Sequence, residues 1–179
     1  MIDFTNLEYL KEGTPRQKDA YSILNELNIF ENLEPYSPIL AGTIPINIDL
    51  PDSDLDIICY VSELNIFYQL IIYRYGQNDQ FNIRSKIIDN IETVIANFNY
   101  KDFSIEIFGQ NIPTTQQNAY KHMMAEYMIL NEKGEEFRQQ VLYLKSTGYK
   151  TEPAFAKLLD LEGDPYLSLL QIHDSQIDI

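Results

Sequence analysis

Two aspartates separated by one residue, Asp54 and Asp56, stand at the head of an apolar run. In a β-strand, residues i and i+2 project from the same face, so both carboxylates would lie together, about 6.6 Å apart along the strand. The residues that would face the other way are Leu55, Ile57, Cys59 and Val61. Two like charges at this spacing are unfavourable unless a positive charge lies between them. The pair therefore predicts a site for a hard divalent cation.

A glycine-containing loop and a third carboxylate accompany this pair. The short apolar run 39–41 ends at Gly42-Thr43, and a loop with two prolines then leads to the aspartates. Glu106 lies in the middle of the otherwise apolar segment 103–109 and shares one strand face with Ser104 and Phe108. Its carboxylate either joins the aspartates from another strand or lies on a solvated sheet face, which antiparallel sheets allow.

The elements that must position these residues follow from periodicity and turn signals. The pattern first predicts a helix from Pro15, with Thr14 and Gln17 as its capping box, then a strand at 39–41 and a strand carrying the aspartates. A helix capped by Ser62 and ending at Gly76 follows, and then a strand at 81–88. Last comes a hairpin of 93–98 and 103–109 with the four-residue loop 99–102. From residue 114 onward the pattern is helical only. We expect an α+β fold in which a mixed core, 1–112, carries a helical part, 113–179, as one compact unit.

Composition narrows the classes of partner. The chain has 13 Lys and Arg against 27 Asp and Glu, a formal net charge of −14, which argues against a long nucleic acid as substrate. A local basic pocket could still accept a small phosphorylated molecule. The sequence contains no signal pattern and no apolar segment long enough to span a membrane. The single cysteine, Cys59, fits a reducing cytoplasm, and its place on the apolar strand face favours an inert core thiol.

These motifs resemble a known superfold. Their order is similar to the signature of polymerase beta-like nucleotidyltransferases. That signature consists of an apolar residue, Gly and a small hydroxyl residue, then Asp-apolar-Asp-apolar about ten residues later, and an acidic residue in a later strand. In this chain Asp54 follows Thr43 by 11 positions. More narrowly, the chain resembles the uncharacterised bacterial DUF4269 family through the stretches LAGTIPINIDLPDSDLDI, IEIFGQ, QNAYKHM, GYKTEPAFAKLL and GDPY.

The resemblance implies a nucleotidyltransferase-like mixed sheet with flanking helices, and a role for particular residues. Asp54, Asp56 and Glu106 match the three carboxylates that bind Mg²⁺, or Mn²⁺, in the superfold, and they would be the catalytic residues. Gly42 would let a triphosphate approach the backbone, while the hydroxyl of Thr43 would donate to it. Ser53 would supply a second hydroxyl from the opposite side of the loop.

Positive charge for a triphosphate must come from outside the loop, which contains no Lys or Arg between Thr43 and Asp54. The candidates are Arg84, Lys121, Lys145 and Lys150. Lys150 precedes Thr151-Glu152-Pro153, which reads either as an ordinary capped helix start or as a helix N-terminus directed at the anion, with Glu152 as a further possible site residue. If none of these cations reaches the site, a pseudoenzyme becomes plausible.

Two histidines complete the candidates. His122, beside Met123 and Met124, is either a packed or surface histidine or a general base or phosphate donor, and His173 is expected at the surface.

The function that we expect is transfer of a nucleotide from an NTP to a hydroxyl of an unknown small molecule or protein. Two alternatives remain open: a catalytically silent protein that binds a nucleotide or metabolite and regulates a partner, and a toxin-neutralising partner protein.

Overall fold

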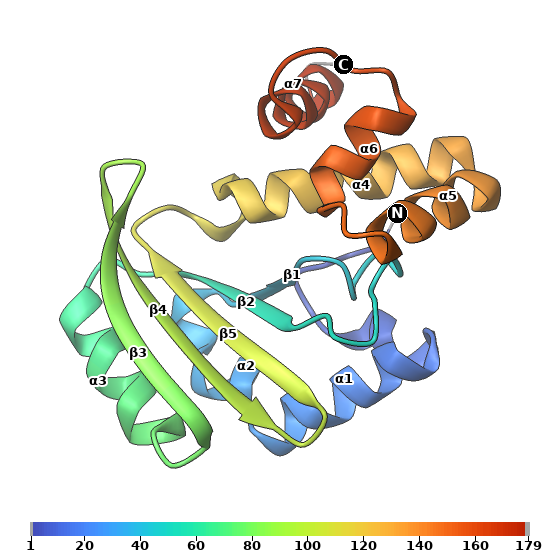
Figure 1. Ribbon diagram of the computed structural model, residues 1–179. Helices are drawn as coiled ribbons and strands as arrows, with labels where there is room; N and C mark the ends of the chain where they lie inside the picture. The colour runs from blue at the N-terminus through green and yellow to red at the C-terminus, as the bar shows by residue number, and fades with distance from the viewer. Residues whose placement is uncertain (1, 178–179) are drawn as a thin grey trace.

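The computed structural model describes residues 2–177, and the side chains of residues 2–174. One mixed β-sheet separates two groups of helices (Figure 1). Helices from the first 75 residues cover one face, and the C-terminal helices stand over one side of the other face. The predicted α+β class, a mixed sheet with flanking helices and a helical C-terminal part, is confirmed. No helix within the described residues is long and apolar enough to cross a membrane.

The sheet has five strands in the order β1-β2-β5-β4-β3. Their bounds are β1 Ile39–Ala41, β2 Leu55–Tyr60, β3 Asp79–Ile88, β4 Ile91–Tyr100 and β5 Phe103–Gln110. Within residues 2–177, β2 and β5 are the one parallel pair, and the other neighbours are antiparallel. A parallel pair needs a crossover, here supplied by α3 Leu64–Tyr75 and the β3–β4 hairpin. The segment before α3 corrects one expectation, because Glu63 rather than Ser62 precedes the helix and no side chain caps it.

Tight turns join the last three strands. β4 and β5 pair up to Tyr100 and Phe103, so the connection has two residues, Lys101 and Asp102, instead of the four that the sequence predicted. Asp89 and Asn90 join β3 to β4 with φ values of 51° and 64°, which two-residue hairpin turns of type I′ require. Strand β4 is therefore longer than predicted at both ends, since its pairing continues to both turns.

The apolar face of the sheet packs on the N-terminal helices. Leu55, Ile57 and Cys59 are fully buried there, as the alternation in the sequence predicted. Helix α1, Pro15–Glu26, begins with the predicted capping box, in which the Thr14 hydroxyl accepts from the Gln17 amide and the Gln17 side chain accepts from Thr14 N–H. The short elements around it are η1 Glu8–Glu12, α2 Ile29–Asn32 and η2 Glu34–Tyr36.

The C-terminal helices form a second apolar cluster with β1 and the loop after it. They are α4 Asn118–Lys133, α5 Glu135–Ser146, α6 Thr151–Leu158 and α7 Pro165–Ile177, preceded by η3 Thr114–Gln116. Ile39 and Ala41 of β1 belong to this cluster, together with Met123 and Phe155. His173 of α7 is only 5% exposed, so the expectation that it lies at the surface is wrong. Because these helices stand over β1, the face of β5 remains partly open (Figure 1).

Candidate functional site

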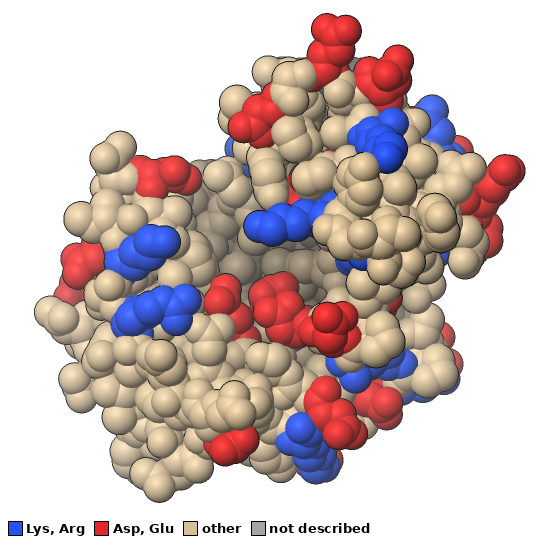
Figure 2. Space-filling model, in the orientation of Figure 1, with Lys and Arg blue, Asp and Glu red and all other residues tan. Residues whose placement is uncertain are grey.

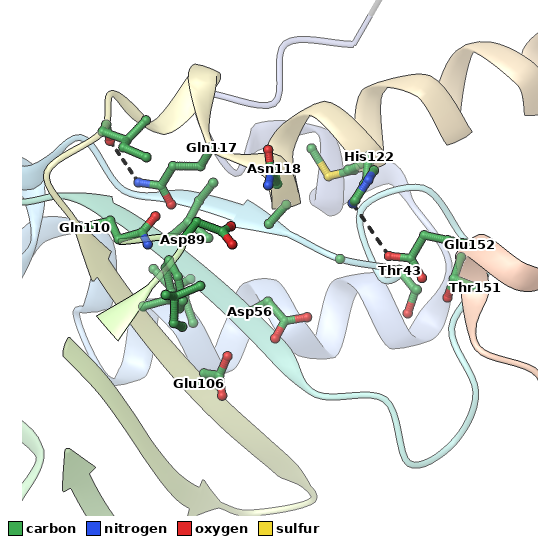
Figure 3. Close-up of a pocket in the computed structure, with 18 of the residues that line it drawn as sticks. Thr43, Asp56, Asp89, Glu106, Gln110, Gln117, Asn118, His122, Thr151 and Glu152 are labelled. Carbon is green, nitrogen blue, oxygen red and sulfur yellow. Dashed lines mark hydrogen bonds and ion pairs between the residues drawn. The ribbon is translucent and has the colours of Figure 1, made fainter. Parts of the chain in front are cut away.

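A cavity of about 360 Å³ lies between the polar face of the sheet and helices α4 and α6. In Figure 2 it appears as a hollow between the sheet and the C-terminal helices, with acidic side chains gathered along its lower edge. Side chains from β2, β5, the β3–β4 turn and the first turns of α4 and α6 line it (Figure 3). This is the size range of a pocket for a small molecule.

Gly42 and Asp56 meet at the floor of this cavity. The residue before the glycine, Ala41, pairs with Asp56 in the β1–β2 register. Gly42 has a φ of 80°, a value that favours glycine, and a Cβ at this position would collide with Oδ2 of Asp56. Both the turn and the close approach of the carboxylate therefore require glycine here.

Asp56 and Glu106 lie side by side on the parallel strands β2 and β5. They are direct partners in the register, both line the cavity, and Figure 3 shows both carboxylates on its floor. Asp54 precedes β2, is exposed and does not line the cavity. Burial, together with the nearby charges of Asp54 and Glu106, raises the pKa of Asp56 to about 7. The three carboxylates thus interact electrostatically, although only two lie in the cavity.

A polar chain across three strands fixes Glu106. Asn97 of β4 is its register partner and donates from Nδ2 to Oε2 of Glu106 at 2.9 Å. Arg84 of β3 donates to Oδ1 of Asn97 at 2.8 Å. Arg84, a predicted phosphate-binding candidate, therefore supports the Glu106 carboxylate through Asn97. Sequence reasoning missed Asn97, because the four-residue loop that it predicted would place Ile95 opposite Glu106.

The loop between β1 and β2 is held by its own hydroxyls. Thr43 lines the cavity, and its Oγ1 lies 3.4 Å from Oγ of Ser53. The Ser53 hydroxyl also accepts from the Leu50 amide at 2.9 Å and does not line the cavity. Arg16 donates to the carbonyls of Pro51 and Ser53, both at 3.1 Å. The structure thus uses Ser53 to shape the loop, and Thr43 is the hydroxyl that faces the cavity.

The predicted basic residues stand apart from the cavity wall, which no Lys or Arg side chain of residues 2–174 lines. Lys121 lies 3.5 Å from Asp174 of α7. Lys145 is buried and donates to the Ile48 carbonyl at 2.5 Å, and burial lowers its pKa. Lys150 is exposed at the N-cap position of α6. In Figure 2, basic side chains border the hollow on two sides without filling it.

His122, Glu126 and Glu152 form the helical wall of the cavity. Nδ1 of His122 lies 3.7 Å from Oε1 of Glu152, and its Nε2 lies 3.0 Å from the Tyr166 carbonyl, which can only accept. Glu126, one turn after His122 on α4, is 4% exposed. Burial raises its pKa well above the usual range, as does the charge of Glu152, whereas Lys145 acts in the opposite direction. Sequence reasoning missed Glu126, which the helical pattern does not distinguish from a surface residue.

Side-chain amides line the far end of the cavity, at the start of α4 (Figure 3). Gln117 donates from Nε2 to the carbonyls of Cys59 and Ile112, both at 2.9 Å. Gln110 donates to the Thr93 hydroxyl at 2.8 Å. Oε1 of Gln117 is buried and has no hydrogen-bond partner in the described part of the chain. No sequence motif pointed to these residues, which became neighbours only through the packing of η3 and α4 against β5.

The carboxylates suit a hard cation such as Mg²⁺, which prefers oxygen ligands. Within residues 2–174, no three His, Cys, Asp or Glu side chains are gathered closely enough to enclose an ion as they stand. Two observations support a cation at this position: the charges of Asp54 and Glu106 act unfavourably on Asp56, and Gly42 lacks the Cβ that would collide with Oδ2 of Asp56. A cation near Asp56 would relieve this repulsion.

Comparisons with known proteins identify the family and the fold. The family model described as a domain of unknown function, DUF4269, matches residues 22–172. No curated protein sequence matches the chain. Among solved structures, the Cid1 poly(U) polymerase with MgGTP bound has a TM-score of 0.53 and 13% identity, and the match covers 72% of this chain and 41% of that chain.

Two further solved structures are similar to the chain to the same degree. The GLD-2/RNP-8 complex has a TM-score of 0.54 and 11% identity, with coverage of 84% and 62%. A cytoplasmic RNA terminal U-transferase has a TM-score of 0.51 and 14% identity, with coverage of 72% and 38%. The chain thus spans less than two thirds of each of these three structures, and likeness at such low identity shows the fold alone. The chain belongs to the DUF4269 family, and its fold is that of the polymerase beta-like nucleotidyltransferases.

Proposed function

We propose that this protein is a nucleotidyltransferase that moves a nucleotide from an NTP to a hydroxyl of a small molecule or protein, with Mg²⁺ as cofactor. The observation that carries the proposal is the pairing of Asp56 with Glu106 on parallel strands beside Gly42, on the floor of a cavity. The fold supports it, because the structural neighbours include Cid1 with MgGTP bound in one structure and with a UTP analogue in another.

The chemistry assigns a role to each residue. Asp54, Asp56 and Glu106 would hold magnesium, which when bound stabilises negative charge that develops on phosphate oxygens. The acceptor oxygen attacks the α-phosphorus of the NTP, the bond to the bridging oxygen breaks, and pyrophosphate leaves. Oε2 of Glu106 already accepts from Asn97, so its Oε1 is the oxygen available to receive the acceptor's proton.

Binding of the triphosphate would use the loop and the start of α6. Gly42 leaves the backbone accessible, and the hydroxyls of Thr43 and Thr151 both line the cavity. Lys150 stands at the N-cap of α6, where the helix dipole also favours an anion. Since no Lys or Arg lines the cavity among the described residues, we assign most of the charge compensation to bound cations.

The acceptor is proposed to be small, although the neighbours include proteins described as poly(U) polymerase and RNA terminal U-transferase. A net charge of −14 repels a polynucleotide backbone over long range. The cavity of about 360 Å³ has room for a small molecule or a single protruding side chain.

The test is Mg²⁺-dependent binding of a non-hydrolysable NTP analogue by calorimetry, followed by pyrophosphate release from the NTP in the presence of a metabolite mixture. Asp56→Asn and Glu106→Gln should abolish both signals. Asp102→Asn, which neutralises an exposed carboxylate in the β4–β5 turn, should leave both unchanged. Unchanged NTP binding and turnover in Asp56→Asn would contradict the proposal.

The second candidate is a catalytically silent protein that binds a nucleotide or metabolite. The absence of Lys and Arg from the lining, within residues 2–174, favours it, because a triphosphate usually requires such charges. Binding of the analogue without pyrophosphate release, under every acceptor mixture tried, would support this candidate over the enzyme.

A further inference from the structure

The helical wall of the cavity carries two carboxyl groups that nucleotide chemistry does not use. Glu126 on α4 and Glu152 on α6 both line the cavity, and the charge of Glu152 acts on Glu126. Glu126 is 4% exposed, and no described residue donates a hydrogen bond to its carboxyl group. Such a buried acceptor without a donor is unfavourable, so its retention beside a cavity indicates a ligand that donates.

The basic side chains near Glu126 do not donate a hydrogen bond to its carboxyl group. Lys145 is the cation that acts on Glu126 electrostatically, but its ammonium group donates to the Ile48 carbonyl. His122 lies one turn before Glu126 and faces Glu152 and the Tyr166 carbonyl instead. The Glu126 carboxyl group therefore faces the cavity beside Glu152 without a hydrogen bond from either basic side chain.

A second, independent observation comes from the amide end of the cavity. Gln117 is 2% exposed and lines the cavity, and its buried Oε1 accepts no hydrogen bond from the described residues. The Gln117 carbonyl is therefore a second acceptor in the cavity lining without a donor among the described residues. Gln117 precedes α4 and lies at the amide end of the cavity (Figure 3), and Glu126 lies further along the same helix.

We propose that the acceptor substrate is a small amino alcohol, bound with its ammonium group between Glu126 and Glu152. Its remaining donor groups would reach Oε1 of Gln117, and its hydroxyl would face Asp56 and Glu106 across the cavity. This assignment rests on the proposed nucleotidyl transfer and adds the class of acceptor to it. The hydroxyl oxygen forms the new bond to the α-phosphorus, pyrophosphate leaves, and the amine remains unmodified.

The charge of the cavity selects this class over neutral or anionic acceptors. Among the described side chains, its lining contains no Lys or Arg but five acidic residues: Asp56, Asp89, Glu106, Glu126 and Glu152. The carboxylates near Gly42 are assigned to magnesium, whereas the pair on the helices has no cation assigned to it. An ammonium ion between these carboxyl groups would favour the charged form of Glu126 and donates up to three hydrogen bonds.

The test uses a matched pair of probes, 1,3-diaminopropan-2-ol and glycerol, which share a three-carbon skeleton and a central hydroxyl. Each is titrated into the protein without nucleotide or Mg²⁺ while the side-chain amide NMR signals of Gln117 and Asn118 are followed. The diamine should bind, and glycerol should not. Glu126→Gln and Glu152→Gln should each weaken diamine binding by at least about tenfold, since each removes a charged hydrogen-bond acceptor.

Glu132→Gln is the control, because Glu132 lies on α4 but is exposed and pairs with Lys133. If Glu126→Gln fails to fold, Glu152→Gln carries the test, because its side chain is 20% exposed. Equal binding of glycerol and the diamine, or diamine binding unchanged in the variants, would overturn the inference. Since this titration contains no NTP or metal, its failure is distinguishable from loss of Mg²⁺-dependent NTP binding, which would overturn the proposed function instead.

Discussion

At the scale of single residues, the site depends on Asp56 being held where its charge is unfavourable. Burial, Asp54 and Glu106 all raise its pKa, and Gly42 allows its carboxylate to approach the β1 turn. The folded protein accepts this electrostatic cost at a position that could recruit a cation. When a protein keeps an unfavourable charge for its function, removal of that charge increases the stability of the fold.

We therefore expect Asp56→Asn to stabilise the protein in a pH-dependent manner. The folded pKa of about 7 lies above the ordinary value of 3.8, so unfolding releases a proton between these limits, and stability falls as the pH rises through this interval. The variant should gain on the order of 2–4 kcal/mol near pH 8 and little near pH 4, since one pKa unit corresponds to about 1.4 kcal/mol. Urea denaturation in EDTA at both pH values measures this. An equal gain at both would contradict the assigned pKa.

Gly42→Ala tests the close approach at the turn. The variant would place a Cβ against Oδ2 of Asp56 in addition to straining a φ of 80°. Gly134→Ala is the matched control, because Gly134 has a φ of 79° and nothing within 4 Å of the added Cβ. We expect the control to lose about 1 kcal/mol and Gly42→Ala to lose more, with loss of NTP binding only in Gly42→Ala. Equal unfolding free energies in the two variants would argue against the clash.

At the scale of elements, strand register decides which residues meet. The two-residue turn at Lys101-Asp102 places Asn97 opposite Glu106, and the parallel β2–β5 pairing places Asp56 on the other side of Glu106. Asn97 thus acts as a positioning residue for a carboxylate at the centre of three strands. Partners that orient a metal-binding carboxylate influence metal affinity strongly.

Asn97→Asp tests this register. The substitution replaces the donor to Glu106 with a carboxylate that repels it, so we expect Mg²⁺ affinity to fall by about 10- to 100-fold with the fold intact. Asn99→Asp introduces the same charge on the same strand opposite Ser104 and serves as the control. Calorimetric titration with Mg²⁺ and the NTP analogue measures both. Comparable affinities of the two variants would mean that Asn97 does not orient Glu106.

At the scale of the whole molecule, charge and layer arrangement limit the partner. The C-terminal helices stand over β1 and close the cavity on one side only, and acidic side chains gather in the open hollow (Figure 2). With a net charge of −14, the surface should repel polyanions at low salt more strongly than at high salt.

The binding of a labelled oligouridylate at different salt concentrations measures this repulsion. Lowering the salt concentration should not strengthen its binding, whereas a protein that neutralises phosphates gains affinity steeply as salt falls. Fluorescence polarisation at about 0.05 and 0.2 M salt distinguishes the two behaviours. Tight binding with a steep negative salt dependence would point to RNA as the acceptor and contradict a small substrate.

The sequence alone determined the features that local periodicity and short motifs encode. Alternation around Asp56 predicted which strand face is buried, the capping box predicted the start of α1, and the spacing of Gly42, Asp54 and Asp56 indicated the superfold. Each of these depends on residues a few positions apart, where backbone geometry fixes which side chains share a face.

Only the tertiary structure decided which distant residues meet. Moving the turn from four residues to two exchanges Ile95 for Asn97 opposite Glu106, and both residues point to the same sheet face, so alternation could not choose between them. In the same way, the burial of Glu126 and Gln117 and the withdrawal of Lys145 from the cavity result from packing between helices and sheet. Such contacts follow from the free energy of the whole chain, which the pattern of a single segment does not contain.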